Sequence, residues 1–322
     1  MSQGSVPPVA LASPAPSLSV VVCTYDRPHY LRKCLQSLLA QTLPTDSYEI
    51  LVVDNGTDEG KIQTILDQTA KPVEVRYVRE PRTGLSYARN TGWNRARGEY
   101  IAFIDDDALA APVWLERILA VFHSVQPRPG CVGGRVAALW ESPRPPWLTD
   151  TLLGNLSVVD WSGQPAILSR EQWLSGCNMT IPRELLAATG GFSTALGRRG
   201  HKLLSMEETA LFARLQQMGH GLYYHPDILV WHHIAPERLN KSWFVRRAFW
   251  NGVSHALARV QQTTPPVSER MHLVRVAFRT KVLRAASLRS LFVASDDPDR
   301  FALRCATIGW IGYVLAMLGL VK

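Results

Sequence analysis

The sequence predicts an α/β protein with a doubly wound, mostly parallel sheet and a helical C-terminal extension. Short apolar runs alternate with amphipathic segments of helical period between residues 18 and 123. Polar residues follow the ends of three of those runs, at the edge where parallel sheets bind ligands. Beyond Pro236 the chain turns helical and basic.

The first predicted strand is LSVVVCT, a continuous β-branched run typical of a strand buried on both faces. In the next segment Leu31, Leu35, Leu38 and Leu39 recur at helical spacing, and Pro28 suits a first helical turn. Four alternations of this kind indicate a parallel sheet. The remaining strands are expected at residues 49–54, 73–78 and 100–105, and the helices at 58–69, 85–97 and 112–123.

The rest of the chain is less regular. A helix at 207–218 and a strand at 227–232 are still expected, followed by basic helical segments at 242–260 and 269–292. The N-terminus lacks a basic segment and a sustained apolar run, which favours a disordered leader over a signal peptide. The expected regions are the leader at 1–16, one domain at 17–235 with halves 17–130 and 131–235, and a helical region at 236–322.

Charge and cysteine content narrow the class of protein. The net charge of +8 suggests an anionic partner, which could be a nucleotide diphosphate, an acidic lipid surface or nucleic acid. Charge alone does not choose among these three. The five cysteines are scattered and form no C-x-x-C pair. They therefore predict neither a disulfide framework nor a zinc site, and they fit a reducing cytoplasm.

Asp105, Asp106 and Asp107 follow the fourth predicted strand directly. Three adjacent carboxylates are tolerated mainly when a cation neutralises them. In an extended segment Asp105 and Asp107 lie on one side and Asp106 on the other. A D-x-D pair suits Mg²⁺ or Mn²⁺, and one imidazole of His232 and His233 could complete the shell. The alternatives are a solvated acidic turn and structural histidines.

Two residues near this edge have two interpretations each. Asp54 ends the second strand and could accept a hydrogen bond from a nucleotide base, or it could form an Asx-turn with Asn55 and Gly56. Arg89 lies in the helix before the acidic strand. It could pair with a carboxylate or a diphosphate, or form an ordinary surface ion pair.

Glu207 and Glu208 open the helix at 207–218. One of them could act as a general base that removes the proton of an acceptor hydroxyl. In an inverting reaction at a glycosidic carbon, such a base lies on the side of that carbon opposite the leaving group. The alternative is a charged first turn that favours the helix dipole. Gly197 and Gly200, just upstream, would let a loop close over a molecule that donates the transferred group.

Together these segments resemble glycosyltransferase family 2, which has the GT-A fold. They are LSVVVCTYDR, EILVVDNGT, GLSYARNTG and YIAFIDDDA, followed by GGF and the Glu-Glu helix. The resemblance runs from Leu18 to His233, with the segments in the family's order and spacing. It implies an inverting transfer from a nucleotide diphosphate sugar, often a UDP-sugar, with Mg²⁺ or Mn²⁺. The acceptor expected for such a transfer is a hydroxyl of a glycan or of a lipid-linked acceptor, as in polysaccharide biosynthesis.

On the donor side, the resemblance assigns Thr24, Tyr25 and Arg27 to the first nucleotide-binding loop and Asp54 to the base. Arg89 and Asp106 complete the expected donor-binding set, although Asp106, which faces the other way, could serve only the structure. The halves 17–130 and 131–235 then correspond to the nucleotide-sugar side and the acceptor side.

For the metal and the acceptor, the resemblance assigns Asp105 to both ribose and metal and Asp107 to the metal. His232 corresponds to a histidine that some relatives use at the metal. Gly176 and Asn178 match the stretch that lines the acceptor side. The family usually has Glu-Asp where this chain has Glu207-Glu208. Glu208 is therefore the expected base, and the choice between it and Glu207 stays open.

The C-terminal region suggests a membrane surface as a further partner. Residues 305–321 carry no charge, at the lower length limit for a spanning helix. Basic amphipathic helices bind anionic membranes, so we expect peripheral contact with the inner face of the cytoplasmic membrane. The alternative is a helical pair packed on the core or on a second subunit. The basic residues before the apolar run are Arg270, Arg275, Arg279, Lys281, Arg284 and Arg289.

Two other functions compete with the glycosyltransferase. A non-catalytic sugar-nucleotide-binding protein would keep the fold and lose the base, but the Glu pair is present. A nucleotidyltransferase would normally carry a Gly-rich basic loop after the first strand, where this chain has Thr-Tyr-Asp-Arg. No nucleic-acid partner is expected, and self-association is left open.

Overall fold

The computed structural model describes residues 15–69, 72–169, 171–200, 202–292 and 297–321. The expected leader therefore lies almost wholly outside the described residues. The strands are β1 (Leu18–Thr24), β2 (Tyr48–Asp54), β3 (Val75–Arg79), β4 (Tyr100–Asp105), β5 (Ala108–Ala110), β6 (Cys131–Trp140), β7 (Ala166–Ile167), β8 (Met179–Pro182) and β9 (Leu222–Ile234). The α-helices are α1 (Pro28–Leu39), α2 (Glu59–Gln68), α3 (Leu85–Arg95), α4 (Trp114–Ser124), α5 (Arg183–Thr189), α6 (Glu207–Gln217), α7 (Lys241–Thr263), α8 (Val267–Ala277), α9 (Ala285–Phe292) and α10 (Pro298–Met317).

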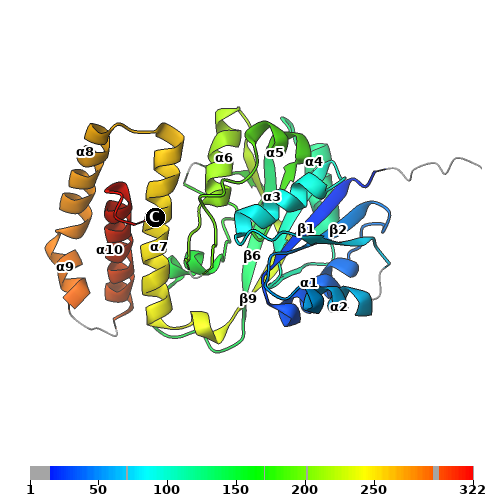
Figure 1. Ribbon diagram of the computed structural model, residues 1–322, viewed down its shortest axis with the longest axis horizontal. Helices are drawn as coiled ribbons and strands as arrows, with labels where there is room; N and C mark the ends of the chain where they lie inside the picture. The colour runs from blue at the N-terminus through cyan, green and yellow to red at the C-terminus, as the bar shows by residue number, and fades with distance from the viewer. Residues whose placement is uncertain (1–14, 70–71, 170, 201, 293–296, 322) are drawn as a thin grey trace, which may run out of the picture.

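The strands form one sheet, which Figure 1 shows to the right of α7. Its strand order is β3-β2-β1-β4-β8-β6-β9-β5, with β7 added against β9. The first four run parallel, and their register aligns Thr24 with Asp54 and Cys23 with Asp105. The strands β8 and β5 pair antiparallel with their neighbours, while β6 and β9 are parallel to each other. The carboxyl ends of β1, β2 and β4 therefore meet at one edge.

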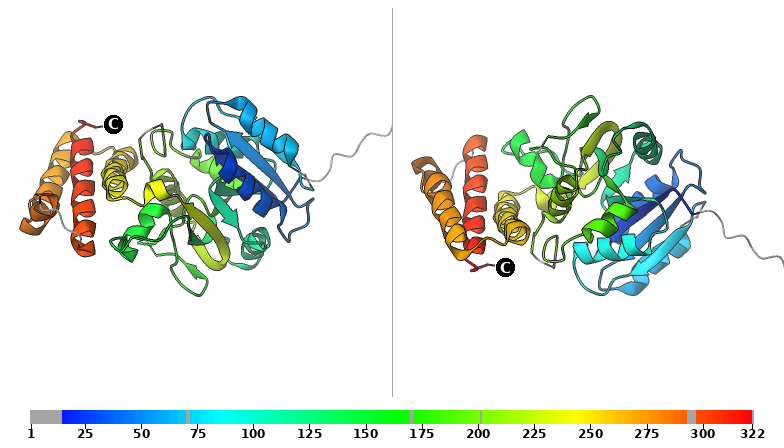
Figure 2. Two further views of the ribbon diagram at one scale, coloured as in Figure 1. Left: turned by 90° about the horizontal axis from the view of Figure 1, so that it is seen from below. Right: turned by 90° about the horizontal axis from the view of Figure 1, so that it is seen from above.

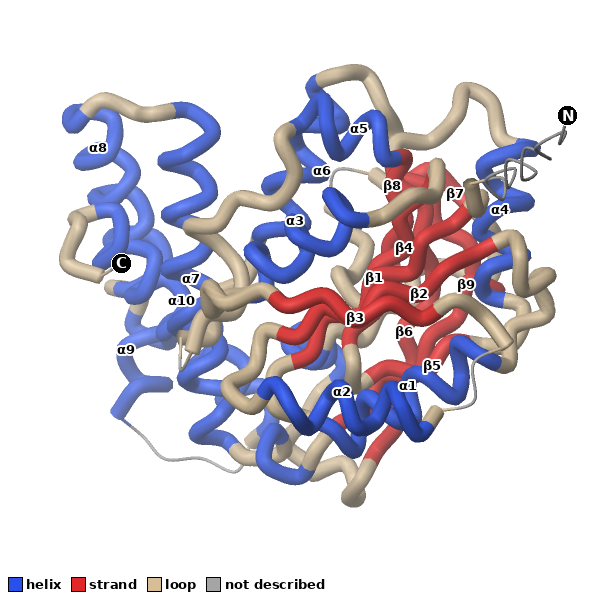
Figure 3. The backbone as a smooth tube through the Cα atoms, turned by 45° about the vertical axis from the view of Figure 1, so that its right-hand side comes forward, coloured by secondary structure: helices blue, strands red, loops and turns tan. Residues whose placement is uncertain are grey.

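Helices cover both faces of this sheet. On one face α1 lies beside α2, and on the other α3 packs against β1 and β2 (Figure 3). The side chains of β1 and β2 are buried along their whole length, as the continuous apolar runs predict. The strands and helices expected up to residue 123 are found within a few residues of their predicted bounds. The α/β doubly wound architecture is thus the one that the sequence predicts.

A second layer of helices stands beside the α/β part, with α7 next to it and α8, α9 and α10 farther out (Figures 1 and 2). The basic segment expected as one helix at 269–292 is divided into α8, a π-helical turn at Phe278–Val282 and α9. A core of aromatic and aliphatic side chains, including Ile234, Phe244 and Phe301, joins this layer to the α/β part.

The apolar C-terminal run belongs to α10, which packs lengthwise on α7. Glycines allow the close approach, because a Cβ at Gly252 would lie 1.7 Å from the carbonyl oxygen of Gly309, and one at Gly312 would lie 2.3 Å from that of Phe249. Among the described residues, no helix has both the length and the apolar character needed to cross a bilayer. Burial on α7 therefore explains much of the uncharged run.

We expect Gly252→Ala to lower the free energy of unfolding by about 2 kcal/mol, because overpacking of up to about 3 kcal/mol outweighs the gain of about 1 kcal/mol that alanine brings to a helix. Thermal and chemical unfolding of the full chain measure the change. Gly163→Ala is the control, since a Cβ there meets no heavy atom within 4 Å. Equal stability of the two variants would contradict the close α7–α10 contact.

Candidate functional site

A cavity of about 330 Å³ opens at the carboxyl edge of β1 and β4, between the first turn of α6 and the end of β9. Most of the residues expected at the site line it. They are Thr24, Tyr25, Arg27, Arg89, Asp105, Asp107, Gly176, Glu207, Glu208 and His232. The cavity wall also includes residues that were not expected there, namely Asn55, Arg198, Arg238 and Arg247.

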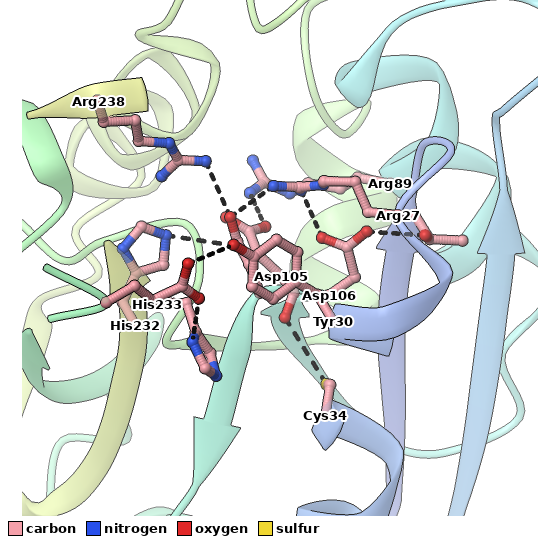
Figure 4. A network of polar contacts seen from close by, with 12 residues as sticks. Arg27, Tyr30, Cys34, Arg89, Asp105, Asp106, His232, His233 and Arg238 are labelled. Carbon is pink, nitrogen blue, oxygen red and sulfur yellow. Dashed lines mark hydrogen bonds and ion pairs between the residues drawn. The ribbon is translucent and has the colours of Figure 1, made fainter. Parts of the chain in front are cut away.

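Asp105, Asp107 and His232 form a cluster in which one potential ligand atom from each lies within 4.8 Å of the others. The strand β5 starts directly after Asp107 and pairs with β9, which brings His232 opposite Ala108. His232 Nε2 lies 3.3 Å from Asp107 Oδ1 (Figure 4). The alternation expected for an extended segment thus places Asp105 and Asp107 on the same side as His232.

The chemistry of this cluster fits a divalent cation. It offers two carboxylates and one imidazole, and the buried Nδ1 atom of His232 has no hydrogen-bond partner among the described residues. Carboxylate oxygens suit Mg²⁺ and Mn²⁺ alike, but an imidazole nitrogen is a poorer ligand for the harder Mg²⁺.

Two arginines balance the charge of Asp107. Arg27 Nη1 lies 2.5 Å from Asp107 Oδ2, and Arg238 Nη2 donates to the same oxygen at 2.9 Å. Burial by itself raises the pKa of Asp107, but His232, Arg27 and Arg238 outweigh it and hold that pKa well below its ordinary value. Asp107 is therefore ionised and available to a cation.

Asp106 faces away from this cluster, and it is not among the described residues that line the cavity. It is fully buried, accepts a hydrogen bond of 2.7 Å from Thr24 Oγ1, and forms an ion pair with Arg27. Burial raises the pKa of Asp106 to about 7 against the attraction of Arg27, and the charge of Asp107 adds to the rise. Asp106 ties β4 to β1, so the expected donor-binding role is replaced by the structural one.

Arg89 connects the acidic cluster to α6. It is buried in the cavity wall, where Nη1 pairs with Glu207 Oε1 at 2.8 Å and Nη2 with Asp105 Oδ1 at 3.2 Å. Its Nη2 also donates to the carbonyl of Gly176 at 3.1 Å, and a Cβ at Gly176 would lie 2.6 Å from that nitrogen. Of its two interpretations, the pairing with carboxylates is the one observed.

Glu207 and Glu208 differ in their surroundings. Glu207 is buried and held by Arg89, whereas Glu208 has no ion pair among the described residues; in both side chains the shielded Oε2 lacks a hydrogen-bond partner there. Burial first, and then the charge of Glu207, raise the pKa of Glu208 to about 8 against the pull of Arg89. A carboxyl group with a pKa near the working pH is suited to proton transfer.

Besides Asp106, two further expected site residues lie outside the cavity wall, namely Asp54 and Asn178. Asp54 is fully buried and accepts hydrogen bonds of 2.9 Å from the backbone N–H of Gly56 and from the Tyr77 hydroxyl, so it forms the Asx-turn of the alternative interpretation. Asn178 is fully buried, accepts from Trp114 Nε1 and donates to two backbone carbonyls. Its side chain therefore braces the sheet from within the core.

Other polar residues near the cavity are brought together only by the fold. Glu141, on the chain just after β6, accepts from the Tyr30 hydroxyl at 3.0 Å and lies 2.8 Å from His233 Nδ1. This network supports the end of β9 beside His232 (Figure 4). Arg198, Arg238 and Arg247 come from a loop, a 3₁₀ turn and α7. Their spacing in the sequence gives no signal that they share a cavity.

Comparison with known proteins gives two kinds of match. The family model described as Glycosyl transferase family 2 matches residues 19–171. The glucosyl-dolichyl phosphate glucuronosyltransferase of Haloferax volcanii is 29% identical over 241 residues, which cover 74% of this chain and 75% of that protein. The succinoglycan biosynthesis protein ExoM of Rhizobium meliloti is 24% identical over 314 residues, which cover 94% of this chain and 93% of that protein.

Solved structures share the fold. The mannosyltransferase PcManGT from Pyrobaculum calidifontis, in complex with GDP-Man and Mn²⁺, has a TM-score of 0.60 at 20% identity and covers 95% of this chain and 87% of its own. S. aureus TarS 1-349, in complex with UDP, has a TM-score of 0.52 at 15% identity, with coverage of 94% and 90%. These likenesses confirm the GT-A-type fold expected from the sequence.

We expect Asp107→Asn and His232→Ala each to weaken Mn²⁺ binding by at least about tenfold, because each removes one ligand of the cluster. Calorimetric titration of Mn²⁺ into the full chain measures the affinity. Asp46→Asn is the matched control, since Asp46 is an exposed acid away from the cavity. If Mn²⁺ binds Asp107→Asn as tightly as the control, the cluster is not the metal site.

Proposed function

Because the chain carries a family 2 glycosyltransferase domain, we propose that it transfers a sugar, with inversion, from a nucleotide diphosphate sugar to an acceptor hydroxyl. That the protein is a glycosyltransferase follows from the domain and from the named relatives. The proposal of an inverting, metal-assisted reaction is carried by one observation. A single cavity holds both the Asp105–Asp107–His232 cluster and Glu208.

Inverting displacement needs a stabilised leaving group on one side of the sugar carbon and a base on the other. A divalent cation held by Asp105, Asp107 and His232 would supply Lewis-acid stabilisation to the departing diphosphate. Glu208 would accept the proton of the acceptor hydroxyl as that oxygen attacks. Arg89 contacts both Asp105 and Glu207, so it would fix the distance between the cation site and the first turn of α6, which carries Glu208.

We propose a UDP-sugar as the donor and a glycan or lipid-linked sugar as the acceptor. UDP is bound by S. aureus TarS and GDP-Man by PcManGT, so uridine and guanosine donors are the two to compare first. Thermal-shift screening of nucleotide sugars with Mn²⁺ identifies the donor, because a ligand at 100 times its dissociation constant adds about 2.7 kcal/mol of stability. Failure of every nucleotide sugar to stabilise the chain would count against the proposal.

The alternative of a non-catalytic sugar-nucleotide-binding protein is less favoured by the site. Such a protein would need no base, yet Glu208 faces the cavity with a pKa raised to about 8 by burial and by Glu207. Metal-dependent release of the nucleotide diphosphate from the donor separates the two functions. A binding protein would hold the donor intact and release no nucleotide diphosphate.

We expect Glu208→Gln to lower the transfer rate by about 10²–10⁴-fold with donor affinity unchanged, since an amide cannot accept the proton. Release of nucleotide diphosphate from the donor found in the screen measures the rate, and nucleotide titration measures affinity. Glu171→Gln is the control, because Glu171 is exposed and outside the cavity wall. A full rate in Glu208→Gln would exclude Glu208 as the base.

The dependence of the transfer rate on pH tests the same assignment of Glu208. Burial and Glu207 raise the pKa of Glu208 to about 8, so its carboxyl is protonated below that pH and is a base above it. The wild-type rate is therefore expected to rise with pH through about 8, and the residual rate of Glu208→Gln should lose this step. A wild-type rate that is flat across this pH range contradicts the assignment.

We also propose that α8, the π-helical turn and α9 contact an anionic membrane surface. Large apolar side chains are exposed along this segment, with Val267 at 74% and Phe292 at 84%. Arg270 does not belong to this surface, because it donates to the carbonyl of Met317 on α10. The exposed basic residues, which we call the basic strip, are Arg275, Arg279, Lys281, Arg284 and Arg289. Mixed basic and apolar exposure is the chemistry that anionic lipid attracts.

We expect the full chain to sediment with vesicles that contain phosphatidylglycerol and not with neutral phosphatidylcholine vesicles. Reversal of two charges of the basic strip, Arg279→Glu with Arg284→Glu, should weaken binding by at least about tenfold, since each basic residue near such a surface contributes about 1 kcal/mol. Arg32→Glu with Lys33→Glu makes the same charge change in α1, at the far end of the molecule (Figure 1). Equal loss in both double variants would contradict a docking role for the basic strip.

A further inference from the structure

Three arginines give the cavity a positive wall near Glu208. Arg198 lies in the loop after Gly197, Arg238 ends the 3₁₀ turn at Pro236–Arg238, and Arg247 lies on α7. Arg238 donates to Asp107 and so belongs to the acidic cluster. Arg198 and Arg247 have no ion pair with a carboxylate among the described residues. Neither guanidinium is therefore in direct contact with a carboxylate, although the charges of Glu207 and Glu208 act on both from a greater distance.

Each of these two arginines has one N–H donor that lacks a hydrogen-bond partner among the described residues. Arg198 Nη1 and Arg247 Nε are shielded from solvent and have no hydrogen-bond partner among the described residues. Arg247 is only 8% exposed, and its Nη1 donates to the carbonyl of Leu203 at 2.9 Å, which fixes the guanidinium in the wall. Burial, followed by repulsion from Arg247 and Arg238, holds the pKa of Arg198 well below its ordinary value. A buried cation without a partner is costly, and a bound anion would remove that cost.

The position of Arg247 distinguishes this pair from the metal cluster. A Cβ at Gly197, next to Arg198, would lie 3.2 Å from the Glu207 carboxyl carbon, and the carboxylates whose charge acts on both arginines are Glu207 and Glu208. Asp107, by contrast, is bonded by Arg27 and Arg238. A donor diphosphate held by a cation at the acidic cluster is thus already flanked by two other arginines. An anion between Arg198 and Arg247 would lie on the side of the base, where the acceptor enters.

We propose that Arg198 and Arg247 form an anion subsite that binds a phosphate group carried by the acceptor, close to the hydroxyl that receives the sugar. This inference rests on the proposed function, because it takes the acceptor hydroxyl to lie at Glu208. Two planar guanidinium groups match the several oxygens of one phosphate. A lipid carrier phosphate and a phosphate on a soluble glycan share this chemistry, so the test has an arm for each.

The test titrates inorganic phosphate into the full chain saturated with UDP and Mn²⁺, and then farnesyl phosphate in detergent. Phosphate is expected to bind without displacing UDP, and Arg198→Gln to weaken it by at least about tenfold with UDP affinity unchanged. Arg247→Gln is the second variant, and Arg246→Gln, exposed on the same helix, is the control. Retained UDP binding shows that a variant is folded. Arg247 is buried on α7, so Arg247→Gln could unfold the chain; Arg198 lies on a loop, and Arg198→Gln then still decides the test.

Competition between phosphate and UDP, or a parallel loss of UDP affinity in Arg198→Gln, would assign the two arginines to the donor diphosphate and overturn the proposal. Equal phosphate binding by wild type and Arg198→Gln would also overturn it. Tighter binding of farnesyl phosphate than of inorganic phosphate identifies a lipid carrier, and equal binding identifies a soluble phosphate; both support the subsite. Metal-dependent release of nucleotide from the donor is measured separately, so a failed subsite leaves the proposed transferase reaction intact.

Discussion

The neutralisation of three consecutive carboxylates at the end of β4 is the constraint on which the rest of the site depends. Asp106 and Asp107 are buried, where an unpaired negative charge is costly. Arg27 bonds both of them, Arg238 bonds Asp107, and Arg89 bonds Asp105. Each arginine comes from a different element, so the loop after β1, helix α3 and the turn after β9 all converge on one point. The site is thus assembled by charge pairing across the sheet edge.

The same constraint couples the two halves of the proposed chemistry. Arg89 contacts Asp105 on one side and Glu207 on the other, and close packing at Gly176 fixes its position. Gly197 serves the base side, because a Cβ there would lie 3.2 Å from the Glu207 carboxyl carbon, at a backbone φ of 85° that favours glycine. With Glu207 held in this way, Glu208 is the carboxyl to which the proposed mechanism assigns the proton transfer. One buried arginine therefore sets the spacing between the metal-type cluster and the base.

The C-terminal helices take part in the site as well as in stability. The helix α7 packs on α10 through Gly252 and also contributes Arg247 to the cavity wall. The predicted boundary at residue 235 falls between His232 and Arg238, which both face that cavity. The segments before and after this boundary therefore share one functional surface. A surface docked on lipid through α8 and α9 would be connected to the acceptor side through α7.

The sequence by itself determined the parallel half of the sheet, because hydrophobic periodicity and strand-end polar residues are local signals. It also singled out Asp105, Asp107, Arg89 and Glu208, since their positions follow strand ends and helix starts. It could not decide between the two interpretations of Asp54, and it gave no sign that the side chain of Asn178 is bonded within the sheet, because only packing shows that Gly56, Tyr77 and Trp114 already bond these two side chains. Arg198, Arg238 and Arg247 gave no local signal at all. Their shared cavity is a product of tertiary structure, which alone brings a loop, a turn and a distant helix to one positively charged wall.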